Sequence, residues 1–295
     1  MFTADSTTDE VLAGVDLTGR TCLITGASAG LGVETVRALK AAGCEVVGAV
    51  RDLDKGHAAL AAVGADCDLV PLDLTDLDSV RSAAVLAAER LSRIDLLINN
   101  AGVMATPLTR TKQGFELQLG TNHLGHFVWT NALLPQLGEG SRIVNVSSRG
   151  HFQSGILWDD PHFRDESTYD KWKAYGQSKT ANILFSVELQ KRYGEQGISA
   201  YSLHPGVILT ELGRHLTADD SESLAKRLPT FKTIPQGAAT TVFAATAPDL
   251  PGGSYLEDVA VAGPVNADFT AGYMAYAVDP DNAARLWDWS VDQTA

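Results

Sequence analysis

Residues 25–32 read TGASAGLG, and this stretch decides the fold because it joins a predicted strand to a predicted helix. The strand is expected at 21–24 and the helix at 31–42, so the glycines fall in the turn and at the helix start. Glycine allows a tight turn, and a helix N-terminus offers unpaired N–H groups and positive dipole charge. The turn therefore predicts a site for the pyrophosphate of a dinucleotide. The candidate contacts are Gly26, Ser28, Gly30, Leu31 and Gly32.

Short β-rich runs alternate with longer helical patterns along most of the chain, which is typical of right-handed βαβ units. We therefore expect an α/β protein of the Rossmann type, with a doubly wound parallel sheet and helices on both faces. Strands are expected at residues 21–24, 45–50, up to about 72, 95–98, 142–146, 199–203 and 255–261. Helices are expected at 31–42 with Gly43 as a C-terminal cap, after a capping box of Thr75 and Asp78, at 175–193 and at 236–245.

The length of 295 residues suits one large domain, and no linker, repeat or low-complexity tract divides the sequence. We predict a single dinucleotide-binding domain over residues 1–295, with an N-terminal extension at 1–16. Two segments, 149–174 and 211–235, break the alternation after strands whose carboxyl ends should meet at the ligand-binding edge of the sheet. We expect both segments to be insertions that wall a substrate pocket.

Charge narrows the choice of partners. The chain carries 23 basic and 36 acidic residues, and its formal net charge of −13 opposes binding to nucleic acid or to an anionic membrane. The N-terminal sequence MFTADSTTDEVLAGVDL lacks the basic start of a signal peptide, and no apolar run reaches the roughly 20 residues of a membrane span. A cytoplasmic location is the simplest interpretation.

Neither the cysteines nor the histidines have the spacing of metal ligands, so no metal site is expected. Cys22, Cys44 and Cys67 are interpreted as small core residues in a reducing compartment. His123 and His126 are interpreted as packing or surface residues of a helix. The chemistry is therefore expected from other side chains.

The end of the second predicted strand indicates which dinucleotide is preferred. An NAD-binding protein usually places a carboxylate there against the ribose 2′-hydroxyl, whereas an NADP-binding protein places a cation against the 2′-phosphate. Val50 stands at the position of the carboxylate and Arg51 follows, while Asp52 is the neighbour that would suit NAD. Because a guanidinium can stack on adenine and pair with a phosphate, the sequence favours NADP over NAD. The alternative role for Arg51 is a solvated loop cation.

Residues 175–179 read YGQSK and supply the candidate chemistry. Tyr175 and Lys179 are four residues apart, so on a helix they share a face and can point at one ligand. A tyrosine has a pKa of about 10 and needs a nearby cation to favour its phenolate, which Lys179 is expected to provide. The spacing alone would also fit a half-buried phenol beside a solvated lysine. Ser147 and Ser148, after the fifth predicted strand, place hydroxyl groups at the same edge.

Taken together, these motifs resemble the short-chain dehydrogenase/reductase family over about residues 16–262. The Gly-x-x-x-Gly-x-Gly spacing of the turn and the sequence NNAG at 99–102 carry the resemblance further. It implies that Ser148, rather than Ser147, binds the substrate oxygen beside Tyr175. Lys179 would also grip the nicotinamide ribose, and the main-chain carbonyl of Asn122 would hold a water that links this lysine to solvent. Further implied cofactor contacts are Asp73, Leu74, Asn100, Ala101, Gly102, Pro205, Ile208 and Thr210.

The long insertion at 149–174, RDLDKG after the second strand and YGQSKTANILFSVELQKR resemble the branch of retinol dehydrogenase and WW-domain oxidoreductase. This implies an oxidoreductase that interconverts a small-molecule ketone or aldehyde and its alcohol with NADP(H). A non-catalytic NADP(H)-binding sensor and a reductase of carbon–carbon double bonds remain the alternatives. The resemblance also implies a homodimer or homotetramer, since many relatives assemble through two helices, one of them bearing the tyrosine.

Apolar side chains in the two insertions suggest a bulky hydrophobic substrate, although the same residues would equally serve to anchor long loops to the core. They are Phe152, Leu157, Trp158, Phe163, Trp172, Leu209, Leu212, Leu216 and Phe231.

Overall fold

An eight-stranded sheet runs through the computed structural model, which describes residues 2–220, 222 and 231–295. The strand order is β3-β2-β1-β4-β5-β6-β7-β8, and all pairs are parallel except β7–β8. Chain order reverses between β1 and β4, where open α/β sheets bind ligands. The strands are β1 Thr21–Thr25, β2 Glu45–Val50, β3 Asp68–Pro71, β4 Leu96–Asn99, β5 Arg142–Val146, β6 Ser199–His204, β7 Tyr255–Glu257 and β8 Ala260–Val261.

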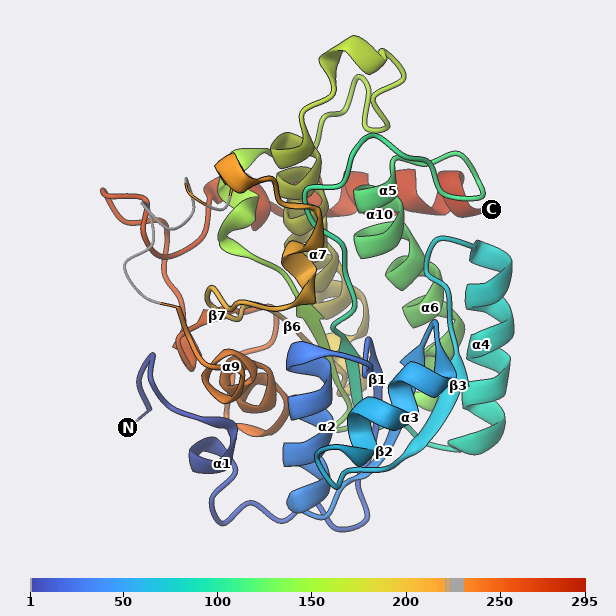
Figure 1. Cartoon of the computed structure of the whole chain (residues 1–295), viewed down its shortest axis with the longest axis vertical. Helices are drawn as coiled ribbons and strands as arrows, with labels where there is room; N and C mark the ends of the chain where they lie inside the picture. Colours follow the sequence, from blue (N-terminus) through green and yellow to red (C-terminus); the bar gives the residue numbers. More distant parts are fainter. Residues whose placement is uncertain (1, 221, 223–230) are drawn as a thin grey trace.

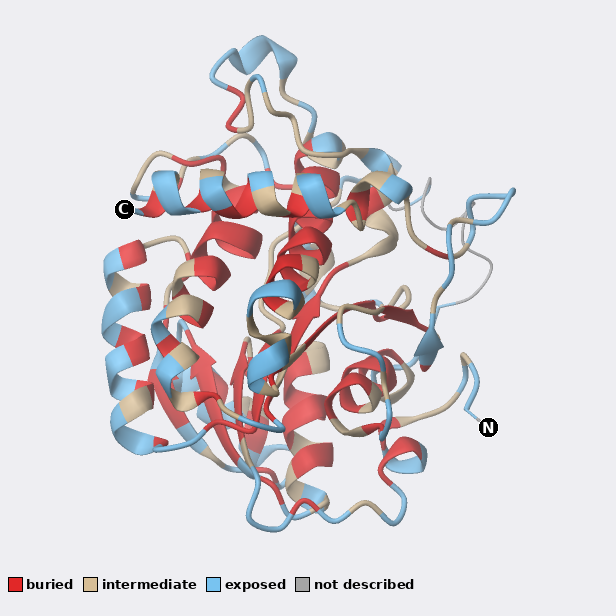
Figure 2. Cartoon of the chain, turned by 180° about the vertical axis from the view of Figure 1, so that it is seen from behind, coloured by how far each residue is buried: buried red, intermediate tan, exposed pale blue. Residues whose placement is uncertain are grey.

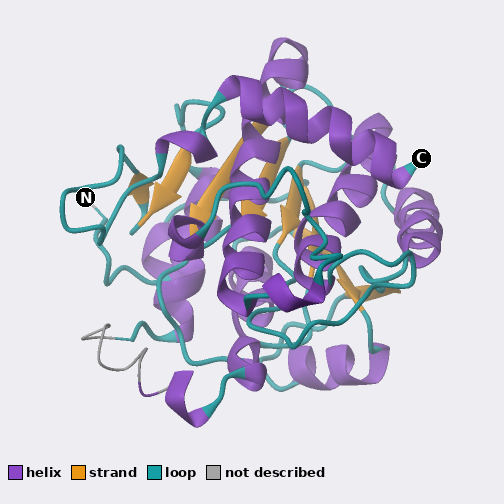
Figure 3. Cartoon of the chain, turned by 90° about the horizontal axis from the view of Figure 1, so that it is seen from above, coloured by secondary structure: helices purple, strands orange, loops and turns teal. Residues whose placement is uncertain are grey.

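Helices cover both faces of this sheet (Figures 1 and 3), which confirms the doubly wound Rossmann-type fold. One face carries α2 (Gly30–Ala41), α3 (Leu53–Ala61) and α9 (Ile234–Thr246), and the other carries α4 (Leu77–Arg90), α6 (His126–Leu133) and α7 (Lys171–Tyr193). In the described residues, further helices are α1 Thr8–Val11, α5 Leu117–Leu119, α10 Pro280–Thr294 and the π-helix η1 Gly120–Gly125. Short 3₁₀ turns lie at Leu134–Gln136, Arg149–Gln153, Glu166–Thr168, Gly194–Gln196, Glu211–His215 and Ala275–Ala277. In the described part of the chain, no helix is both long and apolar enough to span a membrane.

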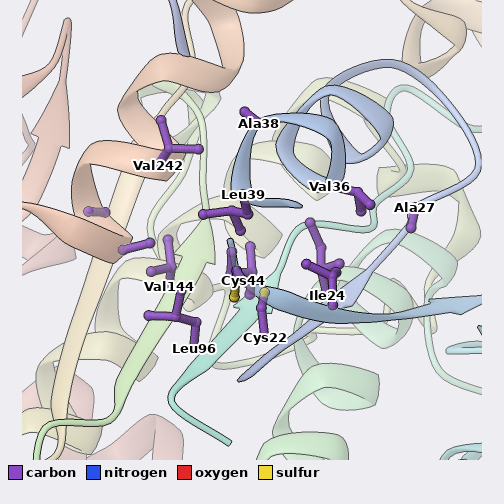
Figure 4. Packing of buried hydrophobic residues seen from close by; sticks show 14 of the residues in the cluster. Cys22, Ile24, Ala27, Val36, Ala38, Leu39, Cys44, Leu96, Val144 and Val242 are labelled. Atoms are coloured by element: carbon purple, nitrogen blue, oxygen red, sulfur yellow. The ribbon is translucent and has the colours of Figure 1, made fainter. Parts of the chain in front are cut away.

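Two apolar layers hold the helices to the sheet, and the central strands are buried on both sides (Figure 2). Alternate strand residues face opposite layers, as Leu23 and Ile24 of β1 do, so both sets must be apolar. Figure 4 shows the layer under α2 and α9, where Cys22 and Cys44 pack as small core residues. Cys67 packs at its margin and is half-buried.

Local signals account for most helix ends. Gly43 follows α2 with φ +93°, and its N–H donates to Lys40 O at 2.9 Å, so the predicted cap is confirmed. The predicted capping box of Thr75 and Asp78 is wrong by one residue. The Thr75 amide and hydroxyl both donate to Asp73 Oδ1, at 2.9 and 2.7 Å, and Asp76 caps α4 instead.

The last predicted strand, residues 255–261, is also wrong, because the structure has a hairpin of β7 and β8 there. Asp258 and Val259 form its two-residue turn with φ values of 52° and 59°. Such turns usually contain glycine or asparagine, and neither residue is present here to signal the reversal.

Three further helix boundaries differ from the prediction. α7 begins at Lys171, four residues early, because Asp170 caps it. α3 and α10 were not predicted, although Asp52 caps the first and Asp279 followed by proline opens the second. A capping aspartate was thus the readable signal in all three cases.

Candidate active site

The glycine turn lies between β1 and α2 and packs directly against the loop after β4. Gly26 has φ +77°, and a Cβ there would lie 2.9 Å from Ala101 Cα. A Cβ on Gly32 would lie 2.1 Å from Gly26 O, so both positions require glycine. The N-cap of α2 is Ala29, whose methyl group cannot accept a hydrogen bond. The amides of the first turn are therefore free to bind an anion.

A groove of about 550 Å³ opens beside this turn. Its lining includes Ser28 and Gly30 from the turn, Lys55 from α3, and Thr210 and Glu211 from the segment after β6. The uncapped amides of α2 fit the phosphates of a dinucleotide, while Lys55 is paired with Glu211 at 2.5 Å.

The loop after β4 ties the turn to the rest of the site. The amides of Asn100 and Ala101 both donate to Thr25 Oγ1 at 3.0 Å, and Asn100 Nδ2 donates to Thr25 O at 2.9 Å. A Cβ on Gly102 would lie 3.1 Å from Asn122 Oδ1. The structure therefore brings the residues of the NNAG motif against the glycine turn and the helix of Asn122.

At the end of β2, Arg51 is exposed while the neighbouring carboxylate is engaged. Asp52 Oδ1 accepts the Lys55 amide at 3.0 Å and so caps α3. This hydrogen bond directs the carboxylate that would suit NAD toward the helix.

The residues after β3 are engaged locally as well. One oxygen of Asp73 is held by Thr75, and the Leu74 side chain is buried in the core. Any contact of Leu74 with a nucleotide would therefore run through its main chain.

Ser148 and Tyr175 lie side by side although 26 residues separate them. Ser148 lies two residues after β5 in an extended conformation, and its Oγ accepts the Gly150 amide at 3.0 Å. A Cβ on Gly150 would lie 2.6 Å from Tyr175 Cε1 and 3.3 Å from Ser148 Oγ, so this glycine makes room for both groups. Ser147 is buried and donates to Lys179 O at 2.7 Å, which leaves Ser148 as the hydroxyl beside the phenol.

The electrostatics of Tyr175 and Lys179 differ from the expectation. Burial raises the pKa of Tyr175 to about 12, and a hydrogen bond with Ser148 opposes this only in part. Burial lowers the pKa of Lys179 to about 7. The Lys179 Nζ donates to Val146 O at 2.9 Å and lies 5.7 Å from the centre of the tyrosine ring. Lys179 was expected to stabilise the Tyr175 phenolate. In the protein without a bound cofactor, the desolvation of both side chains outweighs that effect.

Asn122 lies in the π-helix η1 and is fully buried. Its side chain exchanges hydrogen bonds with the Val103 main chain, at 2.8 and 2.9 Å, and donates to Ser178 Oγ at 2.9 Å. Asn122 therefore joins the loop after β4 to α7, which carries Tyr175 and Lys179.

The segment after β6 folds back over the glycine turn. Pro205 is buried, and Ile208 Cγ1 would lie 2.6 Å from a Cβ on Gly237 of α9. Thr210 Cγ2 would lie 3.2 Å from a Cβ on Gly30. The predicted contacts on the turn and on this segment thus lie on one groove.

Parts of the two insertions are anchored rather than turned toward the groove. The guanidinium of Arg285, on α10, lies 4.0 Å from the centre of the Trp158 ring, and Phe163 is buried against Tyr169. By contrast, Leu209 is 75% exposed and Phe231 is 40% exposed. Residues 221 and 223–230 of the second insertion lie outside the described part of the chain.

Sequence reasoning missed one glycine of this site. Gly150 lies inside a segment without a recognisable motif, and only the packing of the tyrosine ring explains it. His126 and His123 are both buried, so helix packing was the right interpretation and a surface position was wrong. Among the described residues, no cluster of histidine, cysteine and carboxylate side chains has the geometry of a metal site.

The fold and the arrangement of this site define the class of protein, and comparison with known proteins agrees. Residues 20–159 match the family model described as short chain dehydrogenase. The chain is 41% identical over 286 residues to short-chain dehydrogenase/reductase prx1 of Penicillium roqueforti, covering 91% of this chain and 83% of that protein. It belongs to the short-chain dehydrogenase/reductase family and is an oxidoreductase of the NAD(P)-dependent kind.

Within the family, the chain lies close to the retinol dehydrogenase branch. It is 40% identical over 255 residues to retinol dehydrogenase 12 of Mus musculus, covering 83% of this chain and 79% of that protein. The crystal structure of an uncharacterized protein from Mycobacterium Paratuberculosis matches with a TM-score of 0.77 and 38% identity, covering 99% and 97% of the two chains. The NADP active-site complex of Pseudomonas aeruginosa RhlG matches with a TM-score of 0.65 and 26% identity, covering 82% and 95%.

Proposed function

We propose that this protein is an NADP(H)-dependent oxidoreductase that interconverts a ketone or aldehyde and the corresponding alcohol. The observation that carries the proposal is the Ser148 hydroxyl beside the buried Tyr175 phenol, with Lys179 one helical turn further along α7. The groove along the glycine turn supports a dinucleotide site next to this group.

When bound, the dinucleotide supplies the hydride to the carbonyl carbon. The residues of the chain act on the oxygen. Ser148 and Tyr175 donate hydrogen bonds to it, which polarises the carbonyl, and Tyr175 then gives its proton to the forming alkoxide. Lys179, held by Val146 O, orients the nicotinamide ribose and returns a proton toward the tyrosine.

The pKa of Tyr175 favours carbonyl reduction over alcohol oxidation in the protein without bound cofactor. With a pKa of about 12 the phenol is protonated at neutral pH, and this is the form that can act as an acid. Alcohol oxidation follows the same path in reverse and needs extra positive charge near the phenol.

Two observations support NADP(H) as the preferred dinucleotide. Arg51 is exposed after the end of β2, whereas the Asp52 carboxylate caps α3. We propose that Arg51 pairs with the 2′-phosphate. The NADP in the RhlG complex is in keeping with this assignment.

We further propose a bulky hydrophobic substrate. Leu209 and Phe231, near the two ends of the second insertion, are exposed, and exposed apolar side chains suit an apolar ligand. A series of ketones and aldehydes of increasing chain length should therefore show a rising kcat/KM.

The decisive experiment follows NADPH absorbance with a panel of ketones, aldehydes, quinones and enones, and identifies the products. Consumption of a carbonyl with formation of its alcohol would establish the function. Loss of a carbon–carbon double bond instead would establish an enone reductase. Tight NADPH binding without turnover across the panel would favour a sensor.

The variant Tyr175→Phe tests the acid. We expect it to lower kcat by about 10³-fold or more while leaving NADPH affinity nearly unchanged, because only the reacting hydroxyl is lost. Near-normal turnover of this variant would refute the assignment.

A further inference from the structure

His126 is the first residue of α6 and is buried beneath the glycine turn. Its ring joins two parts of the site that are distant in sequence. Nε2 lies 2.8 Å from Thr25 Oγ1, and Nδ1 lies 3.0 Å from the main-chain oxygen of Asn122. The proposed reaction gives this histidine no part.

Hydrogen-bond accounting determines which ring nitrogen carries the proton. Thr25 Oγ1 already accepts the amides of Asn100 and Ala101, which occupy both of its lone pairs. The hydroxyl can therefore only donate to His126, so Nε2 is the acceptor. The Asn122 carbonyl oxygen can only accept, so Nδ1 carries the hydrogen.

The contact with Thr25 requires the neutral ring, because Nε2 must accept the hydroxyl proton. A protonated Nε2 would point at an oxygen without a free lone pair, which makes the imidazolium unfavourable in this place. Burial lowers the pKa of His126 to about 4, although the hydrogen bond to the Asn122 carbonyl opposes this shift, and the charge of Lys179 adds a smaller lowering. The histidine therefore remains neutral at the pH where the protein works.

We propose that His126, fixed as the neutral Nδ1–H tautomer, is a positioning residue that holds the Asn122 carbonyl and ties it to Thr25 beneath the glycine turn. This inference rests on the proposed function, in which Lys179 returns a proton to Tyr175, and on the water that the Asn122 carbonyl is expected to hold for this lysine. Through His126, the orientation of the Asn122 carbonyl depends on Thr25, which also anchors the loop after β4. Loss of His126 should therefore slow proton transfer more than it weakens cofactor binding.

The tautomer can be measured without turnover. In protein labelled with ¹⁵N-histidine, the ring signals that disappear in His126→Asn should show the Nδ1–H pattern and should not titrate between pH 8 and about 5.5. A signal of the Nε2–H form, or titration near pH 6.5, would overturn the inference. Because the measurement needs no substrate, its result is independent of whether the proposed reaction is correct.

The same helix supplies the variants for a kinetic test. Asn131 Nδ2 donates to Phe127 O at 2.8 Å, so an asparagine on α6 reaches the carbonyl four residues back. His126→Asn should therefore keep the donor to Asn122 and lose only the contact with Thr25. His126→Phe loses both contacts.

A matched control is His123→Phe. His123 is equally buried, but its Nε2 contacts Ser290 of α10, away from the groove. The two phenylalanine variants should lose comparable thermal stability, so a difference in kcat between them cannot come from unfolding.

We expect His126→Phe to lower kcat by about 10- to 100-fold and to increase the solvent deuterium isotope effect, with NADPH affinity within about threefold of the parent. His126→Asn should recover most of the kcat. If His126→Phe loses no more kcat than His123→Phe, or if its isotope effect is unchanged, the positioning role is refuted. If the parent protein reduces no carbonyl, the proposed function fails instead, and the tautomer measurement still tests the two contacts.

Discussion

The two sides of the candidate site are held in different ways. On the cofactor side, residues 25–32 and 99–103, main-chain groups meet at contact distance and hydrogen bonds to Thr25 are buried. On the proposed substrate side, the described residues of 149–174 and 211–235, ion pairs join the second insertion to other parts of the chain. They join Lys171 to Asp220, and Lys232 to Asp258 at 2.5 Å.

This difference shows where rigidity is needed. A phosphate site made of main-chain amides loses its geometry if the backbone moves, whereas a substrate wall can shift without loss of the chemistry. We therefore expect substitutions on the cofactor side to act on binding and catalysis, and substitutions of the ion-paired residues of the second insertion to act weakly on either.

Among the substitutions that test this comparison, the largest effect is expected at Lys179, where the two sides meet. Lys179→Met should lower kcat by about 10²-fold or more, because the cation that serves Tyr175 is removed. The free energy of unfolding of the same variant should be roughly 1–3 kcal/mol higher than that of the parent at pH 7, because a buried cation costs stability. Chemical denaturation measures this change, and a large loss of stability would contradict it.

The difference in stability between the parent and Lys179→Met should change with pH in a definite direction. Lys179 has a folded-state pKa of about 7, below its unfolded value of 10.5, so between these values the unfolded chain binds more protons. The stability of the parent should therefore rise relative to Lys179→Met as the pH increases from 7 to 10. A constant difference across this range would show that the lysine is not desolvated.

On the cofactor side, Gly32→Ala should weaken NADPH binding by about 10- to 100-fold, since overpacking costs about 1–3 kcal/mol. The new Cβ would lie 2.1 Å from Gly26 O, so the turn must move. Gly263→Ala is the control, because a Cβ there has no neighbour within 4 Å. Fluorescence titration with NADPH measures both variants, and equal affinities would break the comparison.

A charge deletion on the same side should have a more selective effect. Arg51→Ala should weaken NADPH by about 10- to 100-fold, as expected for a charge-assisted contact, and NADH by much less. Kinetic constants for both dinucleotides provide the measurement. Equal losses for the two would assign Arg51 to a solvated loop.

The smallest effect is expected at Asp220 on the substrate side. A hydrogen bond with Lys171 lowers the pKa of Asp220 to about 2, so their pairing is present above the ordinary pKa near 4 and fades as the pH falls toward 2. Asp220→Asn should cost less than about 1 kcal/mol, because pairs near the surface are screened. Thermal unfolding at pH 7 and pH 3 should show a smaller difference between parent and variant at the lower pH.

The sequence predicts the cofactor side well because its contacts are local or come from motifs. Strands β2 and β5 match their predicted bounds, and the residues of TGASAGLG and NNAG meet in space. The family and its retinol dehydrogenase branch were also predicted correctly.

What the sequence did not reveal depends on distant partners. Trp158 packs under Arg285, which lies 127 positions further along the chain, so no local pattern could show that it anchors a loop. The role of His126 on α6 depends on a contact with Thr25, which lies on the first strand, β1. The raised pKa of Tyr175 reflects burial, which helical spacing cannot measure.

The hairpin of β7 and β8 has a consequence for solubility. A parallel sheet that ended on a long open strand would expose a row of unpaired N–H and C=O groups to other molecules. β8 is two residues long and antiparallel, and the Lys232–Asp258 ion pair places charge at its turn. This edge therefore offers a poor template for a strand from another chain and protects the protein against edge-to-edge aggregation.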